Sequence, residues 1–257
     1  MRPAPLLSAR EVTAGYGAVP VIRGVSVDVA PGEVALVIGP NGAGKSTLIK
    51  ALNGELPLMA GSVLLDGADI SGLTEDLRAA RGLGYVPQSR DVFGTLTVTE
   101  NLEMGGYRLP QQVVADRTAE IFDRFPSLAS LRKRLAQTLS GGERKLLAIA
   151  RALVAQPTAL MLDEPTANLA PAVARRVLTE VVAGLAESGA AVLLIEQRIA
   201  LALDVATWVY VLVDGTPRFA GAAAELRALP DVGAVFFAHP ADSSPNLKSL
   251  GGDAGSG

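Results

Sequence analysis

The 257-residue sequence contains no cysteine, a single histidine and only 4% aromatic residues. Without cysteine the chain can form neither disulfides nor thiolate metal sites, and this composition suits a reducing compartment. The scarcity of aromatic residues argues against base-stacking surfaces, and the net charge of −3 provides no electrostatic reason to bind nucleic acid. The sequence therefore predicts a protein without a nucleic-acid partner.

Long apolar runs are also missing. Hydrophobic residues make up 49% of the chain, enough for a sizeable core of one large domain or two small ones. No run approaches the roughly 20 apolar residues of a membrane-spanning helix. Residues 1–7 include two prolines and no apolar segment, so we expect no signal peptide. These features predict a soluble protein whose membrane role, if any, arises through a partner.

The strongest functional pattern lies between residues 39 and 47. This stretch reads GPNGAGKST and fits G-x-x-x-x-G-K-[ST], with an apolar run before it that suits a buried strand and a helical segment after it. Gly42 and Gly44 lack a Cβ, so the backbone can curl tightly and aim its N–H groups inward. We expect a phosphate-binding loop rather than an ordinary glycine-rich turn. Its expected contact residues are Gly39, Pro40, Asn41, Gly42, Ala43, Gly44, Lys45, Ser46 and Thr47.

Polar side chains from three parts of the chain supply the expected chemistry. Lys45 brings a positive charge toward the outer phosphates, and the Ser46 hydroxyl can ligate Mg²⁺. Asp163 and Glu164 follow an apolar strand, where one carboxylate suits Mg²⁺ and the other water activation; the alternative is a solvated strand end. Gln88 follows a strand that ends at a proline, which leaves its carbonyl free for a metal or a water; the alternative is an ordinary loop glutamine. We expect Ser46, Gln88 and Asp163 as metal ligands.

A second anion site is expected about a hundred residues further on. Ser140 is a natural N-cap for a helix predicted at 144–155. The adjacent Gly141 and Gly142 expose backbone N–H groups at the positive end of that helix. An ordinary helix start needs only one capping residue, so the two additional glycines favour an anion-binding role.

The pattern of apolar residues divides the chain into segments. Residues 6–38 read as strands, and Tyr16, which stands between two glycines there, either stacks on a base or packs on its own hairpin. The segment from Thr97 to Gln137 is helical and opens with a capping box, which indicates a helical insertion in an α/β chain. Further helices are predicted at 171–187, 199–205 and 222–229. The polar tail of residues 241–257 is expected to be disordered.

Together these patterns resemble the ATP-binding-cassette ATPases over residues 6–237. The resemblance implies an α/β fold: a P-loop NTPase core with a mixed or parallel sheet, an N-terminal antiparallel β subdomain and an inserted α-helical subdomain at about 89–137. All of this lies within one domain of residues 1–240. The family motifs are matched in order by Tyr16 (adenine-stacking aromatic), Gly39–Thr47 (Walker A), Gln88 (glutamine loop), Leu139–Glu143 (signature), Ala159–Glu164 (Walker B and catalytic glutamate) and Asn168–Pro171 (D-loop).

Two departures from the family pattern narrow the resemblance. Most cassettes carry a histidine after the penultimate core strand, where this chain has Gln197, and many have an aspartate where the D-loop here reads Ala170-Pro171. The stretches at 85–93 and 96–106 are also distinctive. In all four features the chain resembles the second ATPase subunit of branched-chain amino acid importers. The related urea and short-amide importers share these features. Because the histidine contacts the γ-phosphate in most cassettes, we expect Gln197 to supply a hydrogen bond there without a positive charge. Such a site is expected to hydrolyse ATP more slowly than a histidine-bearing site. The alternative is that Gln197 is only a polar residue at a strand end and that Glu164 suffices.

The resemblance also implies cofactors, catalytic roles and partners. ATP and Mg²⁺ are the implied cofactors, with Glu164 as general base and with Lys45 and the metal stabilising charge on the γ-phosphate. Two cassettes of the family meet head to tail, so Ser140, Gly141 and Gly142 would serve the partner's ATP. The implied partners are a second ATPase subunit (the same chain or a different one), two transmembrane permeases contacted by the insertion, and indirectly an extracytoplasmic binding protein. The implied location is the cytoplasmic face of the cell membrane.

Two other classes of cassette remain as alternatives. Soluble cassette ATPases of translation or DNA repair usually have two cassettes, long coiled-coil insertions or zinc cysteines, whereas this chain has one cassette, no heptad run and no cysteine. An exporter ATPase, for instance for lipopolysaccharide, is disfavoured by Glu196-Gln197 and by Val92-Phe93. The transported substrate is not readable from a cassette, because the permeases and the binding protein select it.

Overall fold

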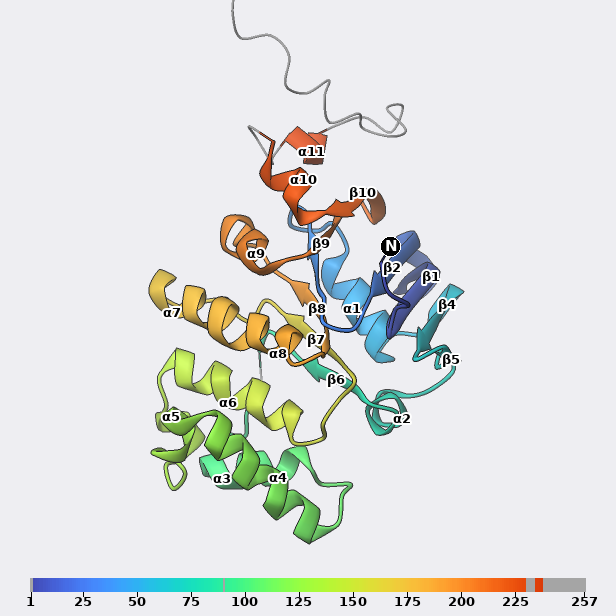
Figure 1. Ribbon diagram of the computed structural model, residues 1–257. Coiled ribbons are helices and arrows are strands. Elements are labelled where there is room, and N and C mark those ends of the chain that lie inside the picture. Colours follow the sequence, from blue (N-terminus) through green and yellow to red (C-terminus); the bar gives the residue numbers. More distant parts are fainter. Residues whose placement is uncertain (1, 90, 230–233, 238–257) are drawn as a thin grey trace, which may run out of the picture.

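The computed structural model describes residues 2–89, 91–229 and 234–237 (Figure 1). The tail expected to be disordered, residues 241–257, lies outside the described residues. Two sheets, a layer of helices on the larger sheet and a separate group of helices make up the described part. The predicted fold class, an α/β core with an N-terminal antiparallel sheet and inserted helices, is confirmed.

The first sheet is antiparallel and has the strand order β2-β1-β4-β5. Buried and partly exposed residues alternate along β2 from Val25 to Val29, as a sheet with one face in the core requires, whereas register shifts interrupt this alternation in β1. Its apolar face contributes to one hydrophobic cluster with the larger sheet and the helix α1 (Lys45–Asn53). The strands are β1 (Leu7–Tyr16), β2 (Val19–Val29), β4 (Leu58–Leu65) and β5 (Ala68–Asp69).

The second sheet has the order β10-β9-β3-β8-β7-β6 and is parallel except for β10. Its central strands are apolar and buried along their whole length, because helices cover one face and α1 with the first sheet covers the other (Figure 1). The strands are β3 (Val34–Ile38), β6 (Leu83–Val86), β7 (Ala159–Asp163), β8 (Ala191–Ile195), β9 (Trp208–Val213) and β10 (Thr216–Ala222).

The register of the parallel strands brings four strand ends level. Ile195 pairs with both Val37 and Asp163, and Val86 pairs with Leu162. The segments that leave β3, β8, β7 and β6 therefore begin at the same edge of the sheet. Ligands of open α/β sheets bind at this carboxyl edge.

Helices on the face of the large sheet opposite α1 pack against its strands and form a second hydrophobic cluster. The helix expected over residues 171–187 is interrupted, since residues Val177–Val182 are π-helical. The Thr179 hydroxyl donates to the Arg175 carbonyl at 3.0 Å within this stretch, and such back-bonding by threonine commonly bends a helix. The helices are α6 (Gly141–Leu153), α7 (Pro171–Arg176), η2 (Val177–Val182), α8 (Ala183–Glu187), α9 (Ile199–Val205), α10 (Ala223–Arg227) and α11 (Ala234–Phe237).

The inserted helices pack on α6 and form a third cluster (Figure 1). Val98, Leu102 and Leu128 are fully buried there against Leu147 and Ala150 of α6. The capping box predicted at Thr97 is confirmed, and it starts the first of these helices. The elements are α3 (Val98–Gly105), α4 (Gln111–Arg124), α5 (Pro126–Ala129) and η1 (Ala136–Thr138). In the described residues we find no helix with the length and apolarity needed to span a bilayer.

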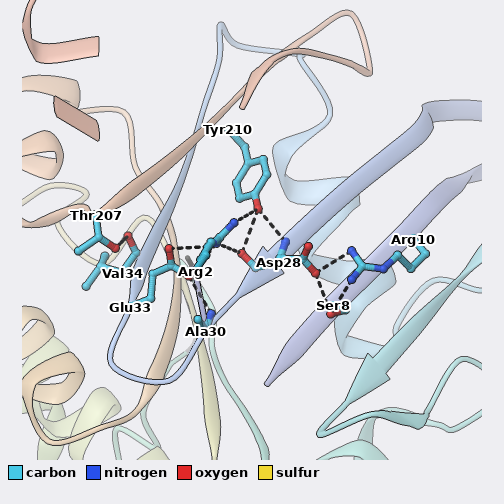
Figure 2. A network of polar contacts seen from close by, with 9 residues as sticks. All are labelled: Arg2, Ser8, Arg10, Asp28, Ala30, Glu33, Val34, Thr207 and Tyr210. Carbon is cyan, nitrogen blue, oxygen red and sulfur yellow. Dashed lines mark hydrogen bonds and ion pairs between the residues drawn. The ribbon is translucent and has the colours of Figure 1, made fainter. Parts of the chain in front are cut away.

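A polar network joins the two sheets (Figure 2). The Tyr210 hydroxyl of β9 donates to the Asp28 carbonyl of β2 at 3.0 Å and accepts from the Asp28 N–H at 2.8 Å. Arg2 donates to Tyr210 and to Glu33, and its guanidinium lies 4.4 Å from the centre of the Trp208 ring. These contacts fix the antiparallel sheet against β9, on the side of the core where α1 lies.

Arg78 of α2 (Glu75–Ala80) closes the C-terminal end of α1. It is 1% exposed and donates to the carbonyls of Ala51 and Leu52 in the last turn of α1, at 2.9 and 2.6 Å. A cation at this end also complements the helix dipole. Burial lowers the pKa of this guanidinium, since Asp69 provides only a weak opposing charge. Backbone carbonyls, rather than a carboxylate, are therefore the main partners of the buried Arg78 guanidinium.

We predict that Arg78→Met lowers the free energy of unfolding by about 2–4 kcal/mol, because buried carbonyls lose their donors. Urea denaturation of the full chain measures this. The control is Arg81→Met, at an exposed position three residues later, which should change stability by less than about 0.5 kcal/mol. Equal stability of the two variants would contradict the capping role of Arg78.

Candidate active site

The loop between β3 and α1 offers unpaired backbone N–H groups. Gly44 is the N-cap of α1 in the left-handed conformation (φ 94°), and no side chain caps the helix. Within the described part of the chain, the N–H groups of Lys45, Ser46 and Thr47 donate to no protein acceptor. Three such groups at a positive helix end fit a phosphate. These three N–H groups are available to an anion, and phosphate binding by the residues of the loop stays a prediction.

Glycine at position 39 has a packing reason that the sequence analysis missed. A Cβ on Gly39 would overlap the Leu212 carbonyl oxygen of β9. Gly42 (φ 82°) and Gly44 adopt the positive φ expected of a tight loop. The Gly215 N–H, in the turn after β9, donates to the Ala43 carbonyl at 3.1 Å. The loop is therefore held by β9 and its turn as well as by its own strand and helix.

Lys45 lies inside the loop. Its Nζ donates to the carbonyls of Gly39 at 2.7 Å and Pro40 at 3.0 Å. Burial lowers the pKa of this ammonium, while the nearby Glu164 and Asp163 carboxylates act in the opposite direction. The amine is thus a partly desolvated cation held at the loop by backbone oxygens.

Glu164 receives one amide on each carboxylate oxygen. Gln88 Nε2 donates to Oε2 at 2.6 Å, and Gln197 Nε2 donates to Oε1 at 2.7 Å. Glu164 itself has a positive φ of 46°, an uncommon conformation for a non-glycine residue. The three residues, with Asn41 and Lys45, line a cavity of about 330 Å³ at the loop. The structure therefore brings together residues predicted from four separate segments.

Asp163 ends β7 and is buried. Burial, together with the neighbouring Glu164 carboxylate, raises the pKa of Asp163 to about 6. In the part of the chain that the structure describes, no cluster of three or more His, Cys, Asp or Glu side chains could hold a metal alone. Ser46, Gln88 and Asp163 instead offer hard oxygen donors, which suit Mg²⁺ when phosphate oxygens and waters complete its shell. The donor set fits the expected metal.

Glu196 and Arg198, on either side of Gln197, were not predicted as site residues. Glu196 is 2% exposed and accepts from the Thr166 N–H at 2.9 Å and from the Gln197 N–H at 3.1 Å. Arg198 donates to the Leu169 carbonyl at 2.6 Å. These contacts tie the end of β8 to the loop after β7. The signal was present, since a carboxylate follows an apolar strand here as it does at Asp163.

The second predicted anion site lies apart from the loop. Ser140 is the N-cap of α6, as predicted, and forms a capping box with Glu143. A Cβ on Gly142 would come within 2.5 Å of Val173 Cγ1, so the helix start packs closely on α7. Ser140, Gly141 and Gly142 line a different cavity, of about 510 Å³, beside the D-loop residues 168–170. The structure does not place them at the cavity of Lys45 and Glu164.

Tyr16 stands at the end of β1, opposite Val19, and is 53% exposed. It does not line the cavity at the phosphate loop, although Val21 of the neighbouring strand β2 does. Its exposed ring is available for stacking, and that role stays a prediction.

Comparison with known proteins identifies the family. Residues 22–167 match the profile of the ABC transporter family. The chain belongs to this family. It is 39% identical to the probable branched-chain amino acid transport ATP-binding protein LivF of Archaeoglobus fulgidus, over 86% of this chain and 94% of LivF. It is 36% identical to the lipopolysaccharide export system ATP-binding protein LptB of Escherichia coli K12, over 81% and 87%.

A solved structure agrees with this assignment to the ABC transporter family. The crystal structure of the ADP conformation of MJ1267, an ATP-binding cassette of an ABC transporter, has a TM-score of 0.82 and 28% identity, covering 92% of this chain and all of MJ1267. The predicted resemblance to cassette ATPases is confirmed. The chain is the ATP-hydrolysing subunit of an ABC transporter, a class of complex in which membrane permeases are the partners.

We predict that Asp163→Asn stabilises the nucleotide-free chain by about 1–2 kcal/mol at pH 7.5, because a buried carboxylate is replaced by a neutral amide. The pKa of Asp163 is raised from 3.8 to about 6 in the folded state. The folded state therefore binds more protons between these values, and wild-type stability falls as pH rises through this window. The gain of the variant should be full above pH 6 and shrink toward pH 4.

Urea denaturation in EDTA at several pH values measures the Asp163 effect. The control is Asp123→Asn, at an exposed position of α4, with a change below about 0.5 kcal/mol. A gain that is constant with pH, or a loss of stability at pH 7.5, would contradict the burial argument.

We predict that Gln197→Ala slows ATP turnover by roughly ten- to a hundred-fold, because Glu164 loses one of its two positioning donors. ATP affinity should change little, since the loop N–H groups remain. Gln197→His should exceed the wild type, because an imidazole can carry a positive charge. The measurements are steady-state turnover and equilibrium ATP binding, with Gln111→Ala at an exposed position as control. Unchanged turnover in Gln197→Ala would make this residue purely structural.

Proposed function

We propose that this chain is the ATP-binding and hydrolysing subunit of a membrane importer for branched-chain amino acids. The observation that carries the proposal is the 39% identity to a LivF protein over nearly the full length of both chains. The Gln197 segment and the D-loop with Ala170-Pro171, which suggested this subgroup, support the same assignment. An importer of urea or short amides is the alternative within this class.

We propose the following roles for the site residues. Glu164 accepts the proton of the attacking water, and the amides of Gln88 and Gln197 hold its carboxylate in place. Lys45 and the loop N–H groups bind the phosphates. Bound Mg²⁺ would neutralise phosphate charge, and Ser46, Gln88 and Asp163 would hold it. Tyr16 would stack on the adenine.

Ser140, Gly141 and Gly142 lie away from the chain's own phosphate loop and complete the site of a second cassette in this proposal. A related but different ATPase subunit is the proposed partner, with a second copy of this chain as the alternative. Each composite site then contains one chain's loop and the other chain's α6. Hydrolysis at the full rate would require both chains.

The proposed ATPase domain covers residues 1–240, and its insertion at about 89–137 would contact the two permeases. Large apolar side chains are exposed on and beside this insertion, at Phe93, Met104, Tyr107 and Leu135, which supports a protein-binding surface there. The proposed location is the cytoplasmic face of the cell membrane. An extracytoplasmic binding protein would deliver the substrate to the permeases.

A lipopolysaccharide exporter ATPase is a second candidate. The 36% identity to LptB favours it. The importer remains preferred because the LivF protein has both higher identity and greater coverage. An uptake experiment distinguishes the two candidates.

We predict that cells lacking this gene lose high-affinity uptake of radiolabelled leucine, and that a plasmid copy of the wild type restores it. Glu164→Gln should not restore uptake, because the amide cannot act as a base. Glu187→Gln, at an exposed position of α8, should restore it fully. Leucine uptake that persists in the deletion would reject this importer. Loss of urea uptake or of lipopolysaccharide export would then identify the alternative.

A further inference from the structure

Lys145 is a buried cation of α6 for which the proposed chemistry has no role. It is 5% exposed. Its Nζ donates to Asp91 Oδ2 at 2.5 Å, to the Gln88 carbonyl at 3.2 Å and, more weakly, to the Pro87 carbonyl at 3.5 Å. An ammonium has three N–H donors, so the loop after β6 engages all of them.

The two ends of this contact belong to different functional segments. Lys145 lies one helical turn after Gly142, the last glycine of the second predicted anion site. The loop it contacts carries Gln88, whose side chain donates to Glu164 Oε2. One buried side chain therefore connects α6, which Ser140 caps, with the glutamine whose amide donates to Glu164.

Lys145 holds the backbone on either side of the Pro87–Gln88 peptide bond through the two carbonyls. Among the described residues, no other side chain donates to the carbonyl of Pro87 or Gln88. The next anchor along the loop is Asn101, which pairs with the N–H and the carbonyl of Phe93 and leaves the Gln88 end to Lys145. Asp91 is only 7% exposed, so loss of Lys145 would remove the one ion pair that this carboxylate forms among the described residues and would leave a buried charge poorly compensated.

We propose that Lys145 is a positioning residue for the metal site. It fixes the Gln88 backbone so that the side-chain amide donates through Nε2 to Glu164 while Oε1 stays available to Mg²⁺. This inference rests on the proposed function, which assigns Gln88 to the metal. Because Lys145 is on α6, the position of the helix that serves the second cassette also sets the position of this chain's own metal ligand.

The test separates metal-dependent binding from phosphate binding. The full chain is titrated calorimetrically with a non-hydrolysable ATP analogue, once in Mg²⁺ and once in EDTA. In EDTA the variants Lys145→Met and Asp91→Asn should bind as the wild type does, because the phosphate loop is intact. In Mg²⁺ both should bind about ten-fold more weakly, the usual effect of losing a residue that orients a metal ligand.

Two further variants control the test. Lys145→Arg keeps a cation and should retain most of the Mg²⁺-dependent affinity, while Lys133→Met removes an exposed lysine of the insertion and should change nothing. The Mg²⁺ concentration for half-maximal hydrolysis should rise about ten-fold in Lys145→Met and Asp91→Asn alone. Thermal unfolding shows whether Lys145→Met folds, and Asp91→Asn probes the same contact if it does not.

Three results would overturn the proposal. Wild-type Mg²⁺ dependence in both Lys145→Met and Asp91→Asn would show that the ion pair only stabilises the fold. Equal weakening in EDTA and in Mg²⁺ would place its effect on the phosphate loop. If Mg²⁺ fails to strengthen analogue binding by the wild type, the proposed function itself fails, and the role of Lys145 fails with it.

Discussion

The first turn of α1 carries backbone N–H groups that no other part of the described chain satisfies. Such groups are costly in a buried position and useful beside an anion. The surrounding structure holds them in place: Gly39 approaches β9 at a distance that only glycine permits, and the turn at Gly215 binds the loop. Arg78 satisfies the opposite end of the same helix. The fold thus stabilises α1 at one end and keeps the other end free for phosphate.

The carboxyl edge of the parallel sheet concentrates negative charge beside that positive helix end. Asp163 and Glu164 are adjacent, and the raised pKa of Asp163 records the cost of burying a charge next to another of the same sign. In a protein selected for stability alone, this arrangement would be unfavourable. In the proposed function a bound Mg²⁺ would offset this repulsion, so the site would exchange stability of the free chain for affinity toward a metal and a nucleotide.

Glutamines occupy two of the positions around the Glu164 carboxylate. An amide offers a donor and an acceptor on one planar group, so Gln88 and Gln197 can hold Glu164 and still present an oxygen to a neighbour. A histidine at position 197 would add a charge that depends on pH near neutrality. The chain therefore combines a cassette architecture with a Glu164 carboxylate that two glutamine amides hold, and no histidine takes part in the described geometry.

Local patterns in the sequence were sufficient for the loop at 39–47, the Asp163-Glu164 pair, the caps at Thr97 and Ser140, and the α/β class, because each depends on neighbouring residues or on a short period. The π-helical turn at 177–182 was not predicted, because the apolar residues before, within and after it follow one helical pattern. The register of β6, β7 and β8 decided that Gln88, Glu164 and Gln197 meet. The packing of the start of α6 on α7 places Ser140 at a different cavity. The contacts of Arg78 and Lys145 were also decided by tertiary structure. Each of these buried cations is bound by backbone carbonyls that are distant from it in the sequence, and no local sequence pattern predicts such long-range contacts.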